Sequence, residues 1–139
     1  MTTIVATRTA MCSDTFSNTK VSGFYVNKIV RVGTTLVGCA GDSTLCQRFI
    51  NWRTTGSKPP VWGVNSQFEA LVLDKTGLYV YYTSCTPDRV NLPYFAIGSG
   101  RQYAMGALSN GASVEKAVEI ACAYDPYSKL PIEKFKLKP

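Results

Sequence analysis

Apolar and polar residues alternate along the first third of the chain, and this period of two predicts β-strands. Residues 3–8 and 10–14 form two such segments with almost nothing between them, which predicts a hairpin with a very short turn. Residues 24–32 and 34–41 predict a second hairpin that breaks at Gly33. The chain is therefore expected to enter a sheet almost at its first residue.

The period becomes helical after the Asp42-Ser43 pair. Leu45, Phe49 and Trp52 then fall on one face, with an acidic residue in the first turn. The connection RTTGSKPPVWGVNS has no period of its own. The remaining expected elements are a hairpin of residues 68–73 and 78–83, a strand over 94–99, helices over 101–109 and 113–124, and an edge strand in PIEKFKL. Antiparallel strand pairs with segregated helices predict an α+β fold of two stacked sheets with helices outside.

Length and composition are those of an ordinary globular protein. The 139 residues fit one domain over residues 1–139, and 45% of them are hydrophobic. No apolar stretch approaches the roughly 18 residues of a membrane span, and no secretory signal is visible. The five cysteines are odd in number and lack CxxC spacing, which argues against a disulfide framework or a zinc site. They predict reduced thiols in a cytoplasmic protein.

The chain has no histidine, and this excludes several kinds of catalytic site. Ser-His-Asp and Cys-His triads are ruled out, as is most zinc catalysis. Proton transfer near neutral pH must then use a perturbed carboxylate, a Lys, a Cys or an α-amino group. The formal net charge is +6, but Lys and Arg are scattered apart from the tail EKFKLKP, and no aromatic-basic motif accompanies them. Nucleic-acid binding is therefore not expected.

Thr2 is a candidate nucleophile because it follows the initiator methionine. Aminopeptidases remove an initiator that precedes a small residue, and removal would leave a hydroxyl and a free amine on one Thr. A Thr hydroxyl is a weak nucleophile until a base takes its proton. An α-amine, with an ordinary pKa of about 7.7–8.0, can act as that base. The alternative is a plain strand residue behind a retained Met1.

Five short motifs, taken in order, resemble the β-type proteasome subunits, and most closely the bacterial HslV (ClpQ) peptidases. They are TTIV at 2–5, VNKIVRV at 26–32, AGD at 40–42, AIGSG followed by YA at 96–104, and YDPYS at 124–128. Each is weak alone, but the ordered set covers nearly the whole chain. The resemblance implies an N-terminal-nucleophile hydrolase fold, a four-layer αββα sandwich of two antiparallel sheets. Such proteins assemble into rings and cleave peptide bonds inside a chamber.

The resemblance implies a threonine-type active site around Thr2. Lys28 would lie beside the Thr2 hydroxyl and lower its proton affinity. Alternation places Lys28 on one strand face with Val26 and Val30, where a buried ammonium needs a partner. Asp14 matches the family acid that pairs with this Lys. The alternatives are a solvent-exposed Lys at a strand edge and an Asp that caps a turn.

Four further residues complete the implied site. Asp125 and Ser128 match a D-x-x-S pattern that supports the terminal amine. Ser99, in the Gly-Ser-Gly turn, matches a Ser that hydrogen-bonds that amine, although such a turn before a helix can also be purely structural. Gly38 matches the glycine whose N–H faces the tetrahedral intermediate.

The resemblance also implies a specificity pocket and a cation site. Four apolar positions match the lining of the first pocket, Val26, Val30, Leu36 and Ala40. They predict cleavage after apolar residues, with plain core packing as the alternative. No cofactor is required for the chemistry, but a monovalent cation such as Na⁺ could be held by backbone carbonyls after the last long helix. The three matching positions are Glu119, Cys122 and Asp125.

The chain also departs from the family pattern. The turn between the first two strands is shorter than usual, and the connection RTTGSKPPVWGVNS replaces the second of a pair of long helices. One helical layer should therefore be reduced. The expected partners are a homo-oligomeric ring (a hexamer or stacked rings), polypeptide substrates and an HslU-type ATPase unfoldase, with no nucleic acid and no membrane. The lost helix puts the usual ring and the ATPase in question. An inactive scaffold subunit and a small-amide hydrolase remain as alternatives.

Overall fold

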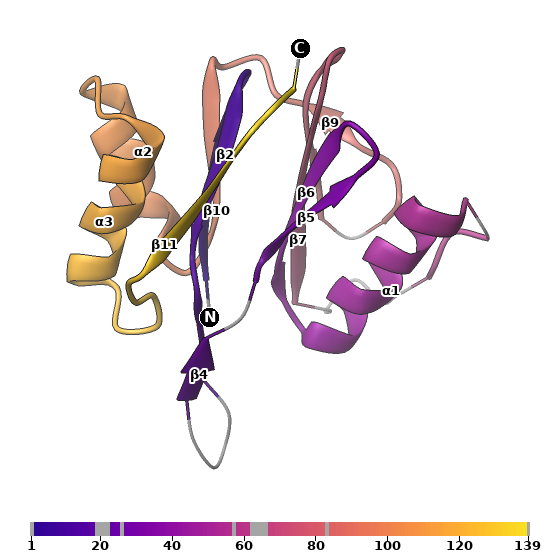
Figure 1. Ribbon diagram of the computed structural model, residues 1–139, viewed down its shortest axis with the longest axis horizontal. Helices are drawn as coiled ribbons and strands as arrows, with labels where there is room; N and C mark the ends of the chain where they lie inside the picture. The colour runs from indigo at the N-terminus through magenta and orange to yellow at the C-terminus, as the bar shows by residue number, and fades with distance from the viewer. Residues whose placement is uncertain are drawn as a thin grey trace.

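Two antiparallel sheets face one another at the centre of the molecule, with helices on both outer sides (Figure 1). The computed structural model describes residues 2–18, 23–25, 27–56, 58–61, 67–82 and 84–138. The expected α+β sandwich is thus confirmed. Within the described residues, no helix has the length and apolar character needed to cross a bilayer.

The first sheet carries the N-terminal strand in its interior. Its order is β10 (Tyr94–Gly98), β1 (Thr3–Thr7), β2 (Ala10–Asp14) and β11 (Ile132–Lys136), and β11 is an edge strand as expected. Ile4 faces the second sheet, whereas Val5 packs under the helices, and both are fully buried. Because both faces of β1 are covered, its sequence is a continuous apolar run bounded by threonines.

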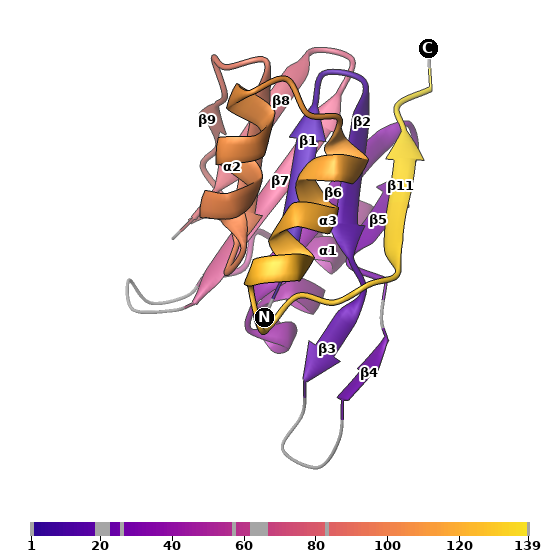
Figure 2. The same cartoon turned by 90° about the vertical axis from the view of Figure 1, so that its left-hand side faces the viewer.

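The second sheet is built from sequential antiparallel strands. Its order is β5 (Ile29–Val32), β6 (Thr35–Gly41), β7 (Phe68–Asp74), β8 (Gly77–Tyr81) and β9 (Asp88–Arg89). A separate hairpin of β3 (Phe16–Asn18) and β4 (Gly23–Tyr25) extends beyond the two sheets (Figure 2). The expected strand over 24–32 includes two residues of β4, but the pairing of β4 with β3 and the strand β9 are not predicted. Strands of two or three residues carry too few positions to show a period.

Among the described residues, three helices cover the outer faces. The helices α2 (Arg101–Ser109) and α3 (Val114–Tyr124) lie on the first sheet, and α1 (Ser43–Thr55) lies on the second (Figures 1 and 2). Phe49 of α1 is fully buried, with its ring centroid 5.2 Å from that of Phe68 and 4.9 Å from that of Tyr81. In the described part of the connection after α1, residues 58–61 are not helical. The second sheet is thus covered by one helix among the described residues.

Polar caps and a glycine define the helix ends. Asp42 is the N-cap of α1 and accepts N–H bonds from Thr44 (2.8 Å) and Leu45 (3.1 Å); it precedes the first turn rather than standing in it as expected. Ser113 caps α3 and accepts from the Lys116 N–H at 3.1 Å. Gly56 ends α1 with a left-handed φ of 67°.

Candidate active site

Thr2 lies at the mouth of the space between the sheets, directly before β1. Its carbonyl oxygen accepts a bond from the Gly100 N–H (3.4 Å), in the turn between β10 and α2. The preceding Gly98 has φ 95°, and a Cβ at that position would collide with the Thr2 carbonyl oxygen. A glycine at 98 therefore lets the turn approach Thr2 closely.

A chain of hydrogen bonds runs from the Thr2 nitrogen into the protein. The Thr2 N–H donates to Ser99 Oγ (3.2 Å), and Ser99 Oγ donates to Asp125 Oδ2 (2.6 Å). Ser128 Oγ donates to the same Oδ2, also at 2.6 Å. The structure thus brings together all three residues expected to support the terminal amine, with Asp125 and Ser128 buried. Their catalytic role stays a prediction.

A buried ion pair lies beside this chain. Lys28 Nζ is 2.9 Å from Asp14 Oδ1, and the two side chains are 6% and 0% exposed. Asp14 Oδ1 also accepts the Thr3 N–H (3.0 Å), while Oδ2 accepts the N–H groups of Lys129 (3.1 Å) and Phe16 (3.3 Å). Four donors therefore satisfy a carboxylate that has no contact with solvent.

The environment of Lys28 acts on its charge in two opposing ways. Burial lowers the pKa of the ammonium below its usual value, and the Asp14 carboxylate opposes that shift. The net pKa is lowered. Lys28 does not lie within a continuous strand over 24–32 as expected, but just before β5. This position lets its side chain reach back to the end of β2 in the other sheet.

Thr3 connects these two networks, and the sequence analysis did not single it out. Its N–H donates to Asp14, and its Oγ1 lies 2.7 Å from Ser128 Oγ. The side chain is fully buried. A threonine at the start of an apolar strand was the available signal, because a buried hydroxyl needs a hydrogen-bond partner.

The nearby cysteines are not nucleophiles. Burial raises the pKa of Cys122 to about 12, and the Asp14 carboxylate adds to the shift. Burial likewise raises the pKa of Cys12 to about 12. Both thiols therefore stay protonated near neutral pH, and the thiol form is a poor nucleophile. Thr2 lines the cleft, and its role as the nucleophile stays a prediction.

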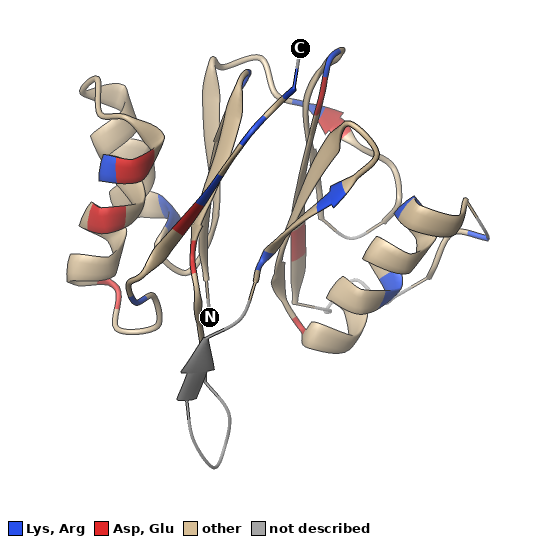
Figure 3. Ribbon diagram, in the orientation of Figure 1, with Lys and Arg blue, Asp and Glu red and all other residues tan. Residues whose placement is uncertain are grey.

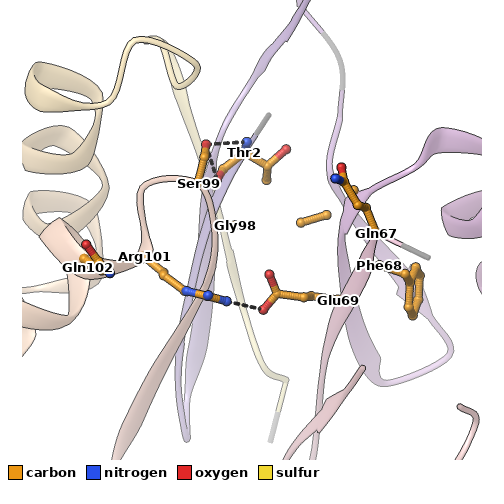
Figure 4. Close-up of a pocket in the computed structure, with 10 residues that line it drawn as sticks. Thr2, Gln67, Phe68, Glu69, Gly98, Ser99, Arg101 and Gln102 are labelled. Carbon is orange, nitrogen blue, oxygen red and sulfur yellow. Dashed lines mark hydrogen bonds and ion pairs between the residues drawn. The ribbon is translucent and has the colours of Figure 1, made fainter. Parts of the chain in front are cut away.

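The cleft beside Thr2 has a volume of about 510 Å³ and runs between the two sheets (Figure 4). Its lining is Thr2, Ala40, Gly41, Gln67, Phe68, Glu69, Gly98, Ser99, Arg101 and Gln102. The lining is a nearly even mixture of polar and apolar surface, whereas the resemblance implies an apolar pocket. Gln67, Glu69, Arg101 and Gln102 come from two distant parts of the sequence, so no local pattern could have grouped them.

The four residues expected to form an apolar pocket are only partly placed there. Ala40 lines the cleft. Leu36 is fully buried and packs in the core between the sheets, as its alternative reading allowed, and Val30 is half-buried. Val26 lies outside the described residues. A preference for apolar residues is thus carried by fewer side chains than the resemblance implies.

The Gly38 amide does not point into the cleft, and the expected oxyanion donor needs correction. In β6 the Cys39 N–H donates toward β5, to the Lys28 carbonyl (3.3 Å), whereas the Asp42 N–H just after β6 donates toward β7, to the Gln67 carbonyl (2.8 Å). Successive amides of a strand point to opposite edges. The Gly38 N–H therefore points toward β7, where the ladder accepts it.

Packing gives a second reason for a glycine at position 38. A Cβ there would lie 2.9 Å from Ile4 Cγ2 and 2.9 Å from Met11 Sδ, in the core between the sheets. Such contacts are too short for carbon and sulfur atoms, so a larger residue would require the Ile4 or Met11 side chain to move. Gly38 thus has a structural role in this chain.

The three positions expected to hold a cation lie in and just after α3. The Asp125 carbonyl already accepts the Ser128 N–H (3.2 Å), and the Glu119 carbonyl lies inside α3, where helical geometry directs it to an amide one turn ahead. Cys122 is in the last turn of α3, where carbonyls lack helical partners. Among the residues that the structure describes, no cluster of three His, Cys, Asp or Glu could hold a metal. The cation stays a prediction, and no chemical step is assigned to it.

Comparisons with known proteins find likeness in structure but not in sequence. No family model matches the chain, and no curated protein matches it. BPH from Thiobacillus denitrificans superposes with a TM-score of 0.75 at 20% identity, covering 99% of this chain and 98% of that one. The same protein in complex with epoxomicin gives 0.71 at 19% identity, with 99% of each chain covered.

Eukaryotic HslV from Trypanosoma brucei is similar over the same extent. It superposes with a TM-score of 0.73 at 17% identity, and 99% of each chain is covered. The resemblance to the proteasome β and HslV family that the motifs indicate is thus confirmed at the level of the fold. The chain has the fold of HslV, the N-terminal-nucleophile hydrolase fold.

Proposed function

We propose that this chain is a threonine-type endopeptidase of the proteasome β and HslV kind, with Thr2 as the N-terminal nucleophile once Met1 is removed. The observation that carries the proposal is the bond from the Thr2 nitrogen to Ser99, which Asp125 orients in turn. Removal of Met1 turns this amide nitrogen into an amine in the same place. The amine then stands on the same residue as the hydroxyl that faces the cleft.

The proposed reaction has two halves that use the same amine. In the first, Thr2 Oγ1 bonds to the scissile carbonyl carbon while the α-amine takes the hydroxyl proton. The C–N bond then breaks, and the protonated amine gives its proton to the leaving amine. In the second half a water attacks the ester carbonyl carbon while the α-amine takes a proton from that water. The bond from the acyl carbon to Thr2 Oγ1 then breaks, the protonated amine returns the proton to Oγ1, and the new C-terminal carboxyl product leaves.

The surrounding residues would position and polarise the reacting groups. Ser99 donates its proton to Asp125 and so presents a lone pair to the Thr2 nitrogen. Lys28 and the Thr3 N–H share Asp14 Oδ1, so the ammonium is held two hydrogen bonds from the backbone of the residue after the nucleophile. A positive charge near Thr2 would favour the ionised hydroxyl.

The substrates we propose are polypeptides, cleaved inside a homo-oligomeric cytoplasmic ring, with an HslU-type ATPase as a candidate partner. The fold supports this, and free cysteines in the described residues fit a reducing compartment. Only one helix is described on the second sheet, and we infer that ring and ATPase contacts differ from those of proteins with two helices there. Native mass spectrometry of the purified chain measures the ring directly, because a ring gives a mass that is a multiple of the protomer.

Intact mass before and after a peptide epoxyketone tests the proposal most directly. We expect a mass lower by one methionine, followed by a single adduct that Thr2→Ala abolishes. A control, Thr44→Ala, alters an exposed Thr in α1 and should leave the adduct unchanged. Retained methionine without an adduct would contradict the peptidase and leave a scaffold subunit. An adduct on a protomer that forms no ring and cleaves only small amides would favour the small-amide hydrolase.

A further inference from the structure

An ion pair crosses the cleft next to the proposed nucleophile. Arg101 Nη1 lies 2.9 Å from Glu69 Oε2. Arg101 begins α2, in the turn that holds Thr2, whereas Glu69 lies on β7 of the other sheet. Figure 4 shows the two side chains meeting between the walls of the cleft, on one side of Thr2. Anything bound beside Thr2 therefore comes close to this pair.

The two side chains of the pair differ in their exposure to solvent. The Arg101 side chain is 52% exposed, and that of Glu69 is 21% exposed. A guanidinium carries five N–H donors in a planar fork. Among the described residues the bridge engages only Nη1 of Arg101, so the other donors can receive a ligand while the bridge stays in place.

The spare donors of Arg101 and the start of α2 favour an anion at Arg101. The other described lining residues carry no charged side chain, so the charges of Arg101 and Glu69 balance one another. The nine-residue helix α2 begins at Arg101, and its N-cap, Gly100, makes no side-chain capping bond. The first amides of α2 thus add a partial positive charge at the same place. Carboxylates are the anions that peptides carry, and they match a guanidinium in shape.

We propose that Arg101 binds a carboxylate of the substrate, so that the cleft selects peptides with an acidic side chain or a free C-terminus close to the scissile bond. The assignment to substrate selection rests on the proposed function of Thr2, but carboxylate binding can be measured without catalysis. Glu69 holds the Arg101 side chain across the cleft and so aims the guanidinium at the bound peptide. Arg101 thus acts in specificity rather than in bond cleavage.

Binding of fluorescein-labelled hexapeptides to the Thr2→Ala variant tests the proposal. One peptide carries a central Glu and an amidated C-terminus, a second carries Gln in its place, and a third has the Gln sequence with a free C-terminal carboxylate. We expect the first or the third peptide to bind at least about 10-fold more tightly than the second, because only these two can form a charged hydrogen bond with Arg101. If the first peptide binds more tightly, the ligand is an acidic side chain; if the third does, the ligand is the C-terminal carboxylate.

Two variants separate Arg101 from general charge effects. Arg101→Gln should remove the preference, whereas Arg48→Gln, which deletes an exposed charge on α1, should keep it. An exposed bridge contributes little to stability, so Arg101→Gln should fold. The double exchange Arg101→Glu with Glu69→Arg keeps a pair and should transfer the preference to a peptide with a central Lys.

Equal or undetectable binding of the three peptides to Thr2→Ala would overturn carboxylate selection. So would a preference that survives Arg101→Gln. Neither result bears on whether Thr2 is a nucleophile, because the epoxyketone adduct reports on that separately. A missing adduct combined with a clear carboxylate preference would refute the peptidase and keep Arg101 as a carboxylate-binding residue.

Discussion

Ser99 hydrogen-bonds to both Thr2 and the buried Asp125 carboxylate. In the proposed mechanism its oxygen accepts a bond from the amine that serves as base. Ser99→Ala should therefore lower kcat about 10-fold, the usual cost of one hydrogen bond, and leave KM nearly unchanged. Steady-state hydrolysis of a fluorogenic peptide measures both constants. A pure rise in KM would contradict the role.

A matched control for this change lies in the same part of the fold. Ser109 ends α2, and its Oγ donates to the Gly106 carbonyl (2.8 Å) away from the cleft. Ser109→Ala removes the same atom and one hydrogen bond, but it should not alter kcat. A loss as large as that of Ser99→Ala would mean that the effect comes from the stability of α2.

Cys12 should make the stability of the fold fall at alkaline pH. Its side chain is fully buried, and burial raises the pKa of the thiol from 9.0 to about 12. Between pH 9 and 12 the unfolded chain has lost this proton and the folded chain has not. The folded state then binds more protons, so the free energy of unfolding decreases as pH rises, by up to about 1.4 kcal/mol per pH unit.

Denaturant unfolding of the wild type and of Cys12→Ala measures this contribution. Below pH 9 the difference in unfolding free energy between the two proteins should be constant, since the thiol is protonated in both states. Above pH 9 the wild type should lose stability faster. Parallel decreases up to about pH 11 would show that Cys12 does not titrate as its burial implies.

At the scale of elements, the turn between β10 and α2 decides where Thr2 sits. Gly98→Ala should destabilise the fold by about 1–3 kcal/mol, because φ 95° is unfavourable for Ala and the new Cβ would strike the Thr2 carbonyl. It should also slow the epoxyketone adduct, since Thr2 must move. Thermal unfolding and adduct kinetics measure the two effects.

Gly106 is the natural comparison for this change. It lies within α2, and a Cβ there would meet no heavy atom within 4 Å. Gly106→Ala should stabilise the protein by about 0.5–1 kcal/mol, because Ala loses less backbone entropy in a helix. The adduct rate should not change. Equal effects of the two substitutions would argue against a special role of the turn at Gly98.

At the scale of the whole molecule, the Lys28–Asp14 pair joins the two sheets. Lys28 precedes β5 in one sheet, and Asp14 ends β2 in the other. Both side chains are buried. Lys28→Met should cost about 3–5 kcal/mol in unfolding free energy, because it leaves a buried carboxylate without its counter-charge. Urea denaturation monitored by circular dichroism gives this value.

Adding Asp14→Asn to Lys28→Met should recover part of that loss. Asn removes the buried charge and keeps an oxygen that can accept the Thr3 N–H. The double variant should therefore be more stable than Lys28→Met alone. Strictly additive losses would show that the two residues do not interact energetically.

Much of the architecture could be predicted from the chain itself. The apolar runs, the capping residues Asp42 and Ser113, and the glycine-containing turns indicate the elements and the two-sheet class, because these signals depend on near neighbours in sequence. The ordered motifs also indicate Thr2 and Ser99 as residues of one site. What they could not convey is the direction of an amide, as at Gly38, since that depends on which strand pairs with which edge.

The sequence by itself determined the elements, the exclusion of histidine chemistry and the candidate nucleophile. The tertiary structure alone decided that Thr3 connects the two hydrogen-bond networks, that Leu36 lies in the core, and that Glu69 and Arg101 meet across the cleft. These features arise from residues far apart in the chain that meet only when the two sheets stack. Local sequence patterns do not predict such long-range contacts, because the two sheets are held together by the burial of their common core.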